Sequence, residues 1–203
     1  MIVIVDYGIG NLASVLNMFK KIGSKNVVIS GNKETIANAS KLLLPGVGAF
    51  DAGMNNLEKS GLIPLLNKKA LEEKVPVLGI CLGMQLLTKR SDEGVKPGLS
   101  WIDGETVKFN FDPELKLKIP HIGWNYINVQ KPNPLIDLES KNRFYFVHSY
   151  YVKCHDKNQS IATSNFGIDF TCMVNKENIF GVQFHPEKSL KFGMKLLENF
   201  SKL

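Results

Sequence analysis

The chain has 203 residues, 44% of them hydrophobic, and carries 25 lysines and arginines against 19 aspartates and glutamates, for a net charge of +6. Its apolar runs are shorter than the roughly 20 residues of a membrane-spanning helix, and its basic residues are dispersed, so we expect binding neither to membranes nor to nucleic acids. There are three cysteines, Cys81, Cys154 and Cys172, an odd number without a C-x-x-C pair, so we expect free thiols. The first residues lack a basic leader, so we expect a cytoplasmic protein.

The first half of the chain alternates between short apolar runs and amphipathic segments. Residues 1–6 predict a buried strand, followed by a glycine-containing turn and by Asn11 as the cap of a helix with apolar positions 12, 15, 16, 19 and 22. Further strands are expected at 27–30, 41–44 and 75–80, and helical segments at 57–73, broken near Gly61 and Pro64, and at 82–88. Because parallel neighbouring strands need long crossovers, this alternation predicts an α/β fold with a parallel sheet covered on both faces.

From residue 105 onward the pattern changes to short β-rich runs separated by turn-forming residues. The runs lie at 105–109, 126–129, 143–148, 161–163, 170–174 and 179–184, and residues 190–200 have the spacing of a closing helix. This half therefore adds antiparallel strands to the largely parallel sheet. The chain contains neither a low-complexity linker nor an internal repeat, so we expect one domain over residues 1–203.

Residues 79–83 have the form G-x-C-x-G at a predicted junction of a strand and a helix. This is the cysteine counterpart of the nucleophile elbow of serine hydrolases, in which flanking glycines permit a sharp turn that exposes the nucleophile at the sheet edge. The start of a helix also favours a thiolate over a thiol. We therefore interpret Cys81 as a nucleophile, although a lone cysteine that ends a strand is more often inert and buried.

A second candidate group is the sequence His185-Pro186-Glu187 at the end of an apolar run. Residues i and i+2 of an extended segment point the same way, and the proline stops strand pairing here. Glu187 can therefore accept a hydrogen bond from one ring nitrogen of His185 and leave the other nitrogen as a base. Two such residues by themselves usually form a surface pair, but together with Cys81 they predict a catalytic triad.

The loop from Pro45 to Gly48 follows a strand that should lie beside the strand of Cys81. Its glycine-flanked amides and the N–H of Leu82 are candidates for an oxyanion hole, with a plain turn as the alternative interpretation. Residues 8–13 match the dinucleotide-binding pattern G-x-G-x-x-A, but the next predicted strand ends without an acidic residue that could hold a ribose. The histidines and cysteines also lack metal-ligand spacing, so we expect neither a cofactor nor a metal.

These motifs resemble the class I, triad-type glutamine amidotransferases, in which G-x-C-x-G-x-Q and a distant H-P-E supply the glutaminase site. Within that family, the chain is similar to the glutaminase subunits of imidazole glycerol phosphate synthase. The blocks that carry this closer resemblance occur in the family's order at residues 6–12, 45–50, 79–86, 120–125, 144–150 and 181–189.

The resemblance implies a flavodoxin-like fold and a heterodimer with a (β/α)8-barrel cyclase. The cyclase would use ammonia from the substrate glutamine to make imidazole glycerol phosphate and aminoimidazole carboxamide ribonucleotide in histidine biosynthesis. The resemblance assigns the triad to Cys81, His185 and Glu187, and the oxyanion hole to Val47 and Leu82. The residues that it places around the glutamine substrate are Gly48, Gln85, Glu93 and Ser149. Those that it places against the cyclase are Trp124, Asn125, Tyr145 and Lys188.

Two alternatives remain open for the function. One is a paralogous glutaminase subunit that supplies ammonia to another synthase, such as an enzyme that aminates a surface sugar. The other is a catalytically silent module that stabilises a barrel partner. Complementation of a histidine auxotroph would distinguish the first, and labelling of Cys81 by a glutamine-mimicking electrophile would test the second.

Overall fold

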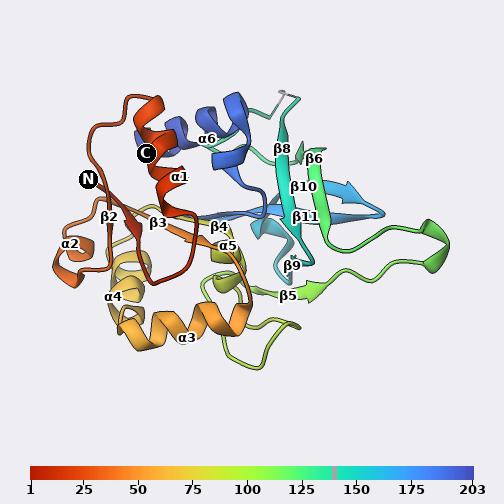
Figure 1. Cartoon of the computed structure of the whole chain (residues 1–203), viewed down its shortest axis with the longest axis horizontal. Helices are drawn as coiled ribbons and strands as arrows, with labels where there is room; N and C mark the ends of the chain where they lie inside the picture. Colours follow the sequence, from red (N-terminus) through yellow and green to blue (C-terminus); the bar gives the residue numbers. More distant parts are fainter. Residues whose placement is uncertain (139–140) are drawn as a thin grey trace.

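A large mixed sheet forms the centre of the fold (Figure 1). The computed structural model, which describes residues 1–138 and 141–203, places a run of parallel strands on one side of this sheet. In spatial order they are β2 (Val27–Ser30), β1 (Ile2–Val5), β3 (Lys41–Gly46), β4 (Val77–Cys81) and β12 (Ile179–Val182). The α/β fold with a largely parallel sheet, which the sequence predicts, is confirmed.

Helices cover both faces of the parallel strands, and this is why those strands are apolar throughout. One face packs against α1 (Leu12–Lys21) and α6 (Leu190–Lys202). The other face packs against α2 (Lys33–Ala37), α3 (Phe50–Ser60), α4 (Ile63–Asn67), which continues as a π-helical turn over Lys68–Glu72, and α5 (Leu82–Leu86).

The antiparallel strands extend the sheet beyond β12. They are β11 (Ile168–Lys176), β10 (Ser160–Phe166) and β7 (Asn128–Val129), while β9 (Tyr150–Cys154) pairs with both β11 and β5 (Gly104–Lys108). A separate antiparallel ribbon consists of β6 (His121–Tyr126) and β8 (Arg143–His148). Single 3-10 turns occur at Pro113–Leu115, Lys157–Gln159 and Pro186–Lys188.

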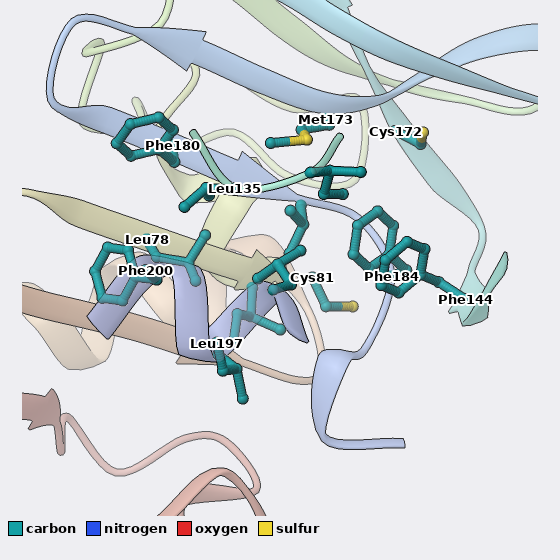
Figure 2. Close-up of a cluster of buried hydrophobic side chains, with 14 of the residues drawn as sticks. Leu78, Cys81, Leu135, Phe144, Cys172, Met173, Phe180, Phe184, Leu197 and Phe200 are labelled. Carbon is teal, nitrogen blue, oxygen red and sulfur yellow. The ribbon is translucent and has the colours of Figure 1, made fainter. Parts of the chain in front are cut away.

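Alternate residues of the central strands pack into two hydrophobic cores, one on each face of the sheet. Figure 2 shows the core beneath α6, where Leu78 of β4 and Phe180 of β12 lie against Leu197 and Phe200. Each fully buried side chain of this size contributes roughly 1.5–3 kcal/mol to folding through its removal from water. The packing fixes the carboxyl ends of β4 and β12 side by side.

The helical segment expected at 57–73 is wrong in its start, because α3 already begins at Phe50. Polar residues obscure the apolar periodicity in the first half of this helix, but Phe50, Met54 and Leu57 bury one of its faces. The expected break is confirmed at Gly61, which ends α3 in the left-handed region with φ of 61°. Asn11 precedes α1 as expected, although its side chain forms no capping hydrogen bond.

Two strand predictions in the second half are also wrong in detail. The run expected at 126–129 consists of the end of β6, which starts at His121, and the separate strand β7. The run expected at 143–148 matches β8, but the sequence analysis did not predict β9, which begins only one residue after β8 ends. Among the residues that the structure describes, no helix has both the length and the apolar character needed to cross a membrane.

Candidate active site

The turn between β4 and α5 places Cys81 at the carboxyl edge of the parallel strands. Its φ of 54° lies in the left-handed region, which residues other than glycine rarely adopt. The flanking glycines are required for this turn. A Cβ atom on Gly83 would lie 1.7 Å from the carbonyl oxygen of Leu44, and one on Gly79 would lie 2.7 Å from the carbonyl oxygen of Gly83. The sequence pattern G-x-C-x-G thus corresponds to a strained elbow.

His185 and Glu187 follow β12, and His185 Nδ1 lies 2.7 Å from Glu187 Oε1. Both side chains are almost fully buried, so the carboxylate holds the ring in one orientation. Burial opposes protonation of the ring, but interactions with the Cys81 sulfur and with Glu187 outweigh it and raise the pKa of His185. Its second nitrogen, Nε2, is buried and has no hydrogen-bond partner among the described residues, so it can serve a bound substrate.

A pocket of about 430 Å³ opens at this edge of the sheet. It brings together Cys81, His185 and the residues expected around the substrate and the oxyanion; these lining residues are Val47, Gly48, Cys81, Leu82, Gln85, Glu93, Ser149 and His185. Glu187 does not line the pocket and contacts the imidazole from behind. In the described part of the chain, no group of His, Cys, Asp and Glu side chains could hold a metal ion.

The loop after β3 is fixed at its base and exposed at its tip. Gly46 pairs with Cys81 in the sheet register, which places the loop beside the elbow. The Tyr7 hydroxyl donates to the carbonyl of Pro45 at 2.7 Å. Burial, together with the nearby Cys81 sulfur, raises the pKa of Tyr7, so this hydroxyl remains a donor at neutral pH. Val47 beyond it is 43% exposed, so its peptide lies at the mouth of the pocket.

Two polar side chains of the pocket are held by fixed contacts. Gln85 Nε2 donates to the carbonyl of Tyr150 at 3.2 Å and to Gln183 Oε1 at 3.1 Å. Glu93 accepts a hydrogen bond from the backbone N–H of Phe50 at 2.9 Å, at the start of α3. These contacts fix the amide and the carboxylate in the positions from which they can recognise a polar ligand.

The sequence interpretation missed Gln183, which is fully buried and whose Nε2 lies 3.7 Å from Cys81 Sγ. Gln183 precedes His185 by two residues in an extended segment, so the argument that paired His185 with Glu187 would have found it. The lining residues of the pocket that were not predicted are Ala49, Pro120, Val147, His148 and Tyr150. Ala49 follows the predicted loop at Val47 and Gly48. The other four lie in and beside the β6–β8 ribbon, and no local motif indicates that this ribbon reaches the pocket.

The four residues expected at a partner interface lie on or next to the β6–β8 ribbon. Trp124 and Tyr145 are cross-strand neighbours with ring centroids 6.3 Å apart, and Lys188 Nζ lies 5.7 Å from the Tyr145 ring. Asn125 differs, because its side chain turns to the inner face of the ribbon and donates to the carbonyl of Asn165 at 2.7 Å. The structure therefore gathers three of the four side chains into one surface cluster.

Comparisons with known proteins give matches over nearly the whole chain. The family model described as glutamine amidotransferase class-I matches residues 3–203. A protein of Methanococcus maripaludis named imidazole glycerol phosphate synthase subunit HisH 2 is 56% identical over 203 residues, which cover 100% of this chain and 99% of that relative. A protein of the same name from Pseudomonas aeruginosa is 50% identical, with 100% of both chains covered. A solved structure described as a glutamine amidotransferase has a TM-score of 0.76 at 18% identity, covering 98% of this chain and 97% of that one, and shares the fold.

Proposed function

The chain belongs to the class I glutamine amidotransferases, and from this premise we propose that Cys81, His185 and Glu187 form its glutaminase triad. The protein hydrolyses glutamine to glutamate and ammonia as the glutaminase subunit of imidazole glycerol phosphate synthase, in histidine biosynthesis. The observation that carries the triad assignment is its geometry: the pocket is lined by both Cys81 and His185, and Glu187 holds the far side of the imidazole.

In the first half of the reaction, the Cys81 thiolate attacks the side-chain amide carbon of glutamine. The negative charge that develops on the carbonyl oxygen is held by the N–H groups of Leu82 and of the Val47 loop, and each such donor contributes about 3 kcal/mol in related hydrolases. The raised pKa of His185 keeps its ring protonated, so that Nε2 can deliver a proton to the departing nitrogen. Ammonia leaves, and a thioester to Cys81 remains.

In the second half, the now neutral His185 removes a proton from a water molecule. The resulting hydroxide attacks the thioester carbon, and the same two groups of N–H donors hold the oxyanion. Collapse of this intermediate breaks the carbon–sulfur bond and releases glutamate. The thiolate and the protonated imidazole are thereby restored, with Glu187 accepting the Nδ1 hydrogen bond throughout.

The ammonia passes to a (β/α)8-barrel cyclase that binds over the exposed face of the β6–β8 ribbon. Support for this docking surface comes from the cluster of Trp124, Tyr145 and Lys188, which presents aromatic area and positive charge to solvent. Asn125 contributes to the same ribbon from its inner face. The full-length similarity to subunits of imidazole glycerol phosphate synthase favours this partner over a surface-sugar synthase.

The test is glutamate release from glutamine by the purified chain, measured with and without the cyclase of the same organism and its nucleotide substrate. We expect hydrolysis that the cyclase stimulates strongly and that Cys81→Ala abolishes. A matched control, Cys154→Ala, removes a buried thiol outside the pocket and should retain activity. Substantial turnover by Cys81→Ala would refute the triad.

Complementation separates the histidine pathway from a different synthase. The wild-type gene, and not the Cys81→Ala variant, should restore growth of a histidine auxotroph that lacks its own glutaminase subunit. Hydrolysis without stimulation by the cyclase, together with failed complementation, would retain the chemistry of Cys81 and assign the ammonia to another partner.

A further inference from the structure

Gln183 is a polar side chain with no exposure to solvent, directly beside the nucleophile. Burial of an amide costs free energy unless its hydrogen-bonding groups are paired. Here both ends are paired: Oε1 accepts from Gln85 Nε2 at 3.1 Å, and Nε2 lies 3.7 Å from Cys81 Sγ. The backbone N–H of Gln183 also donates to the carbonyl of Cys172 at 2.9 Å, so the residue is held at both backbone and side chain.

The hydrogen-bond partners fix which end of each amide is the nitrogen. The Tyr150 carbonyl can only accept, so the Gln85 atom that faces it at 3.2 Å must be the NH2 group. That NH2 group also faces Gln183, and so the Gln183 atom toward it must be the oxygen. The Gln183 nitrogen therefore points at the Cys81 sulfur. Reversing either amide would place two donors or two acceptors against each other.

We propose that Gln183 is a positioning residue that donates a hydrogen bond to the Cys81 thiolate and fixes the amide of Gln85 for the substrate. This proposal rests on the proposed glutaminase function. A donor at the sulfur stabilises the thiolate that attacks glutamine and restricts the rotation of the Cys81 side chain. Because both hydrogens of Gln85 Nε2 are engaged, the atom of Gln85 left for a ligand is Oε1, which accepts from an N–H group of glutamine.

Other groups that face the sulfur are His185, Tyr7 and the carbonyl of Val147, and none duplicates this role. The Val147 carbonyl, 4.0 Å from Sγ, can only accept a hydrogen bond, so it cannot donate to a thiolate. His185 transfers the proton during catalysis. The Tyr7 hydroxyl is committed to the carbonyl of Pro45. His148 and Glu93 also line the pocket, but His148 Nδ1 is engaged by the Tyr150 carbonyl, and Glu93 accepts from the backbone.

Two substitutions separate the two parts of the role. Gln183→Glu keeps the shape and the acceptor toward Gln85 but replaces the donor beside sulfur by an oxygen. Gln183→Met keeps a similar length and removes both polar groups. The matched control is Gln159→Met, because Gln159 is another buried glutamine and lies outside the pocket, where it accepts from the backbone of Asp103.

The first measurement is the rate of alkylation of Cys81 by iodoacetamide as a function of pH, in the full chain. For Gln183→Met, we expect the midpoint of the profile to move to higher pH by about one unit and the rate at pH 7 to fall about tenfold, the effect of losing one hydrogen bond to a charged acceptor. For Gln183→Glu, we expect a shift in the same direction of at least this size, because a carboxylate beside the sulfur also repels the thiolate. Gln159→Met should reproduce the wild-type profile. Unchanged profiles in properly folded Gln183 variants would overturn the donor role.

The second measurement is glutaminase kcat and KM in the complex with the cyclase and its nucleotide substrate. Gln183→Glu should lower kcat about tenfold with KM within about threefold of wild type, whereas Gln183→Met should also raise KM because Gln85 loses its anchor. Equal KM in both variants would refute the role toward Gln85. If Gln183→Met fails to fold by near-ultraviolet circular dichroism, Gln183→Leu replaces it and should raise KM in the same way. If wild type shows no turnover, the proposed function fails, while the alkylation profile still decides the contact with Cys81.

Discussion

At the scale of single residues, His185 and Glu187 form a contact between two side chains that are almost fully buried. We expect Glu187→Gln to lower kcat by roughly 10²- to 10⁴-fold, because the amide cannot balance the charge of the imidazolium that donates the proton. Steady-state glutamate release in the presence of the cyclase measures this loss.

The control for that substitution is Glu198→Gln, which makes the same change from carboxylate to amide on the surface of α6. Glu198 pairs there with the exposed side chains of Lys195 and Lys202, and such surface pairs contribute little. We expect its kcat to stay within about twofold of wild type. A Glu187→Gln enzyme as active as the control would show that the carboxylate has no role in catalysis.

The cysteines differ sharply in reactivity for a physical reason. Burial raises the pKa of the Cys154 thiol to about 11 and that of Cys172 further, so both stay protonated and unreactive at neutral pH. Cys81 lines the pocket. We expect a glutamine-mimicking electrophile to modify Cys81 and neither other cysteine, as mass spectrometry of tryptic peptides would reveal. Protection by glutamine would confirm that the reagent enters the substrate pocket, and labelling of Cys154 or Cys172 in the native chain would contradict the argument.

The residues of the proposed triad could be picked out from the sequence because their spacing is local. The glycines around Cys81 indicate a turn that excludes a Cβ atom. Glu187 follows His185 by two residues, but it lies in the 3-10 turn Pro186–Lys188 and not in the extended chain that the sequence argument assumed. The inward orientation of Asn125 could not be read in the same way. Only the register of β6 against β8 decides which residues of the ribbon face solvent.

At the scale of elements, the β6–β8 ribbon carries a buried pair of histidines on its inner face. His121 Nδ1 lies 3.0 Å from His148 Nε2, and His148 Nδ1 lies 2.8 Å from the Tyr150 carbonyl. Because that carbonyl can only accept, His148 donates from Nδ1 and accepts from His121. Both rings are therefore neutral, and burial lowers the pKa of His121 to about 4 and that of His148 to about 3.

These lowered pKa values predict a loss of stability on acidification. Above the unfolded pKa of about 6.5, the histidine rings are neutral in both the folded and the unfolded chain. Below it, the unfolded chain binds protons, whereas the rings in the folded ribbon stay neutral. Between pH 7 and pH 5 the buried His121 should lower the free energy of unfolding by roughly 1 to 2 kcal/mol. His121→Phe suits the stacking of this ring on Phe146 and Phe166 and removes the titration.

Urea unfolding at both pH values, followed by fluorescence of Trp101, measures the effect. As the pH falls, the free energy of unfolding of wild type should decrease relative to that of His121→Phe. A constant difference between pH 7 and pH 5 would mean that His121 is protonated in the folded ribbon or is accessible to solvent.

The elements themselves were predictable where their packing is simple. β2 was placed correctly at residues 27–30, and the first strand and α1 to within a residue or two, because their apolar periodicity is regular. The start of α3 and the strand β9 were missed for different reasons. α3 buries a narrow stripe among polar residues, and β9 is separated from β8 only by a tight turn at Ser149.

At the scale of the whole molecule, the site is built where parallel strands end together. The ends of β3, β4 and β12 supply the loop of Val47, the elbow and the segment of His185, and their shared register brings these groups to one edge. The sequence predicts this convergence for β3 and β4, because parallel pairing follows from the alternation of strands and helices. It was wrong for the run at 179–184, which was expected among the antiparallel strands, whereas β12 pairs parallel to β4. The ribbon that walls the pocket depends on pairing between distant segments, for which the sequence contains no local signal.

The ribbon also connects the proposed docking surface to the catalytic histidine. The backbone carbonyl of Tyr145 accepts from the N–H of His185 at 2.9 Å, while its ring faces outward beside Trp124. A partner that moves the ribbon therefore acts directly on the segment of the general acid. From the proposed docking, this link predicts that binding of the cyclase changes the rate of glutamine hydrolysis without any contact to the substrate.

We therefore expect Trp124→Ala to weaken binding of the cyclase by about 2 kcal/mol, or roughly 30-fold in Kd, as for a partly exposed aromatic residue at the centre of an interface. Leu71→Ala is the control, since Leu71 has the same 41% exposure as Trp124 but lies on the π-helical turn after α4, away from the ribbon. Isothermal titration calorimetry gives Kd, and glutamate release at saturating cyclase gives the stimulated rate. Trp124→Ala with wild-type affinity would contradict the placement of Trp124 at the centre of the docking surface.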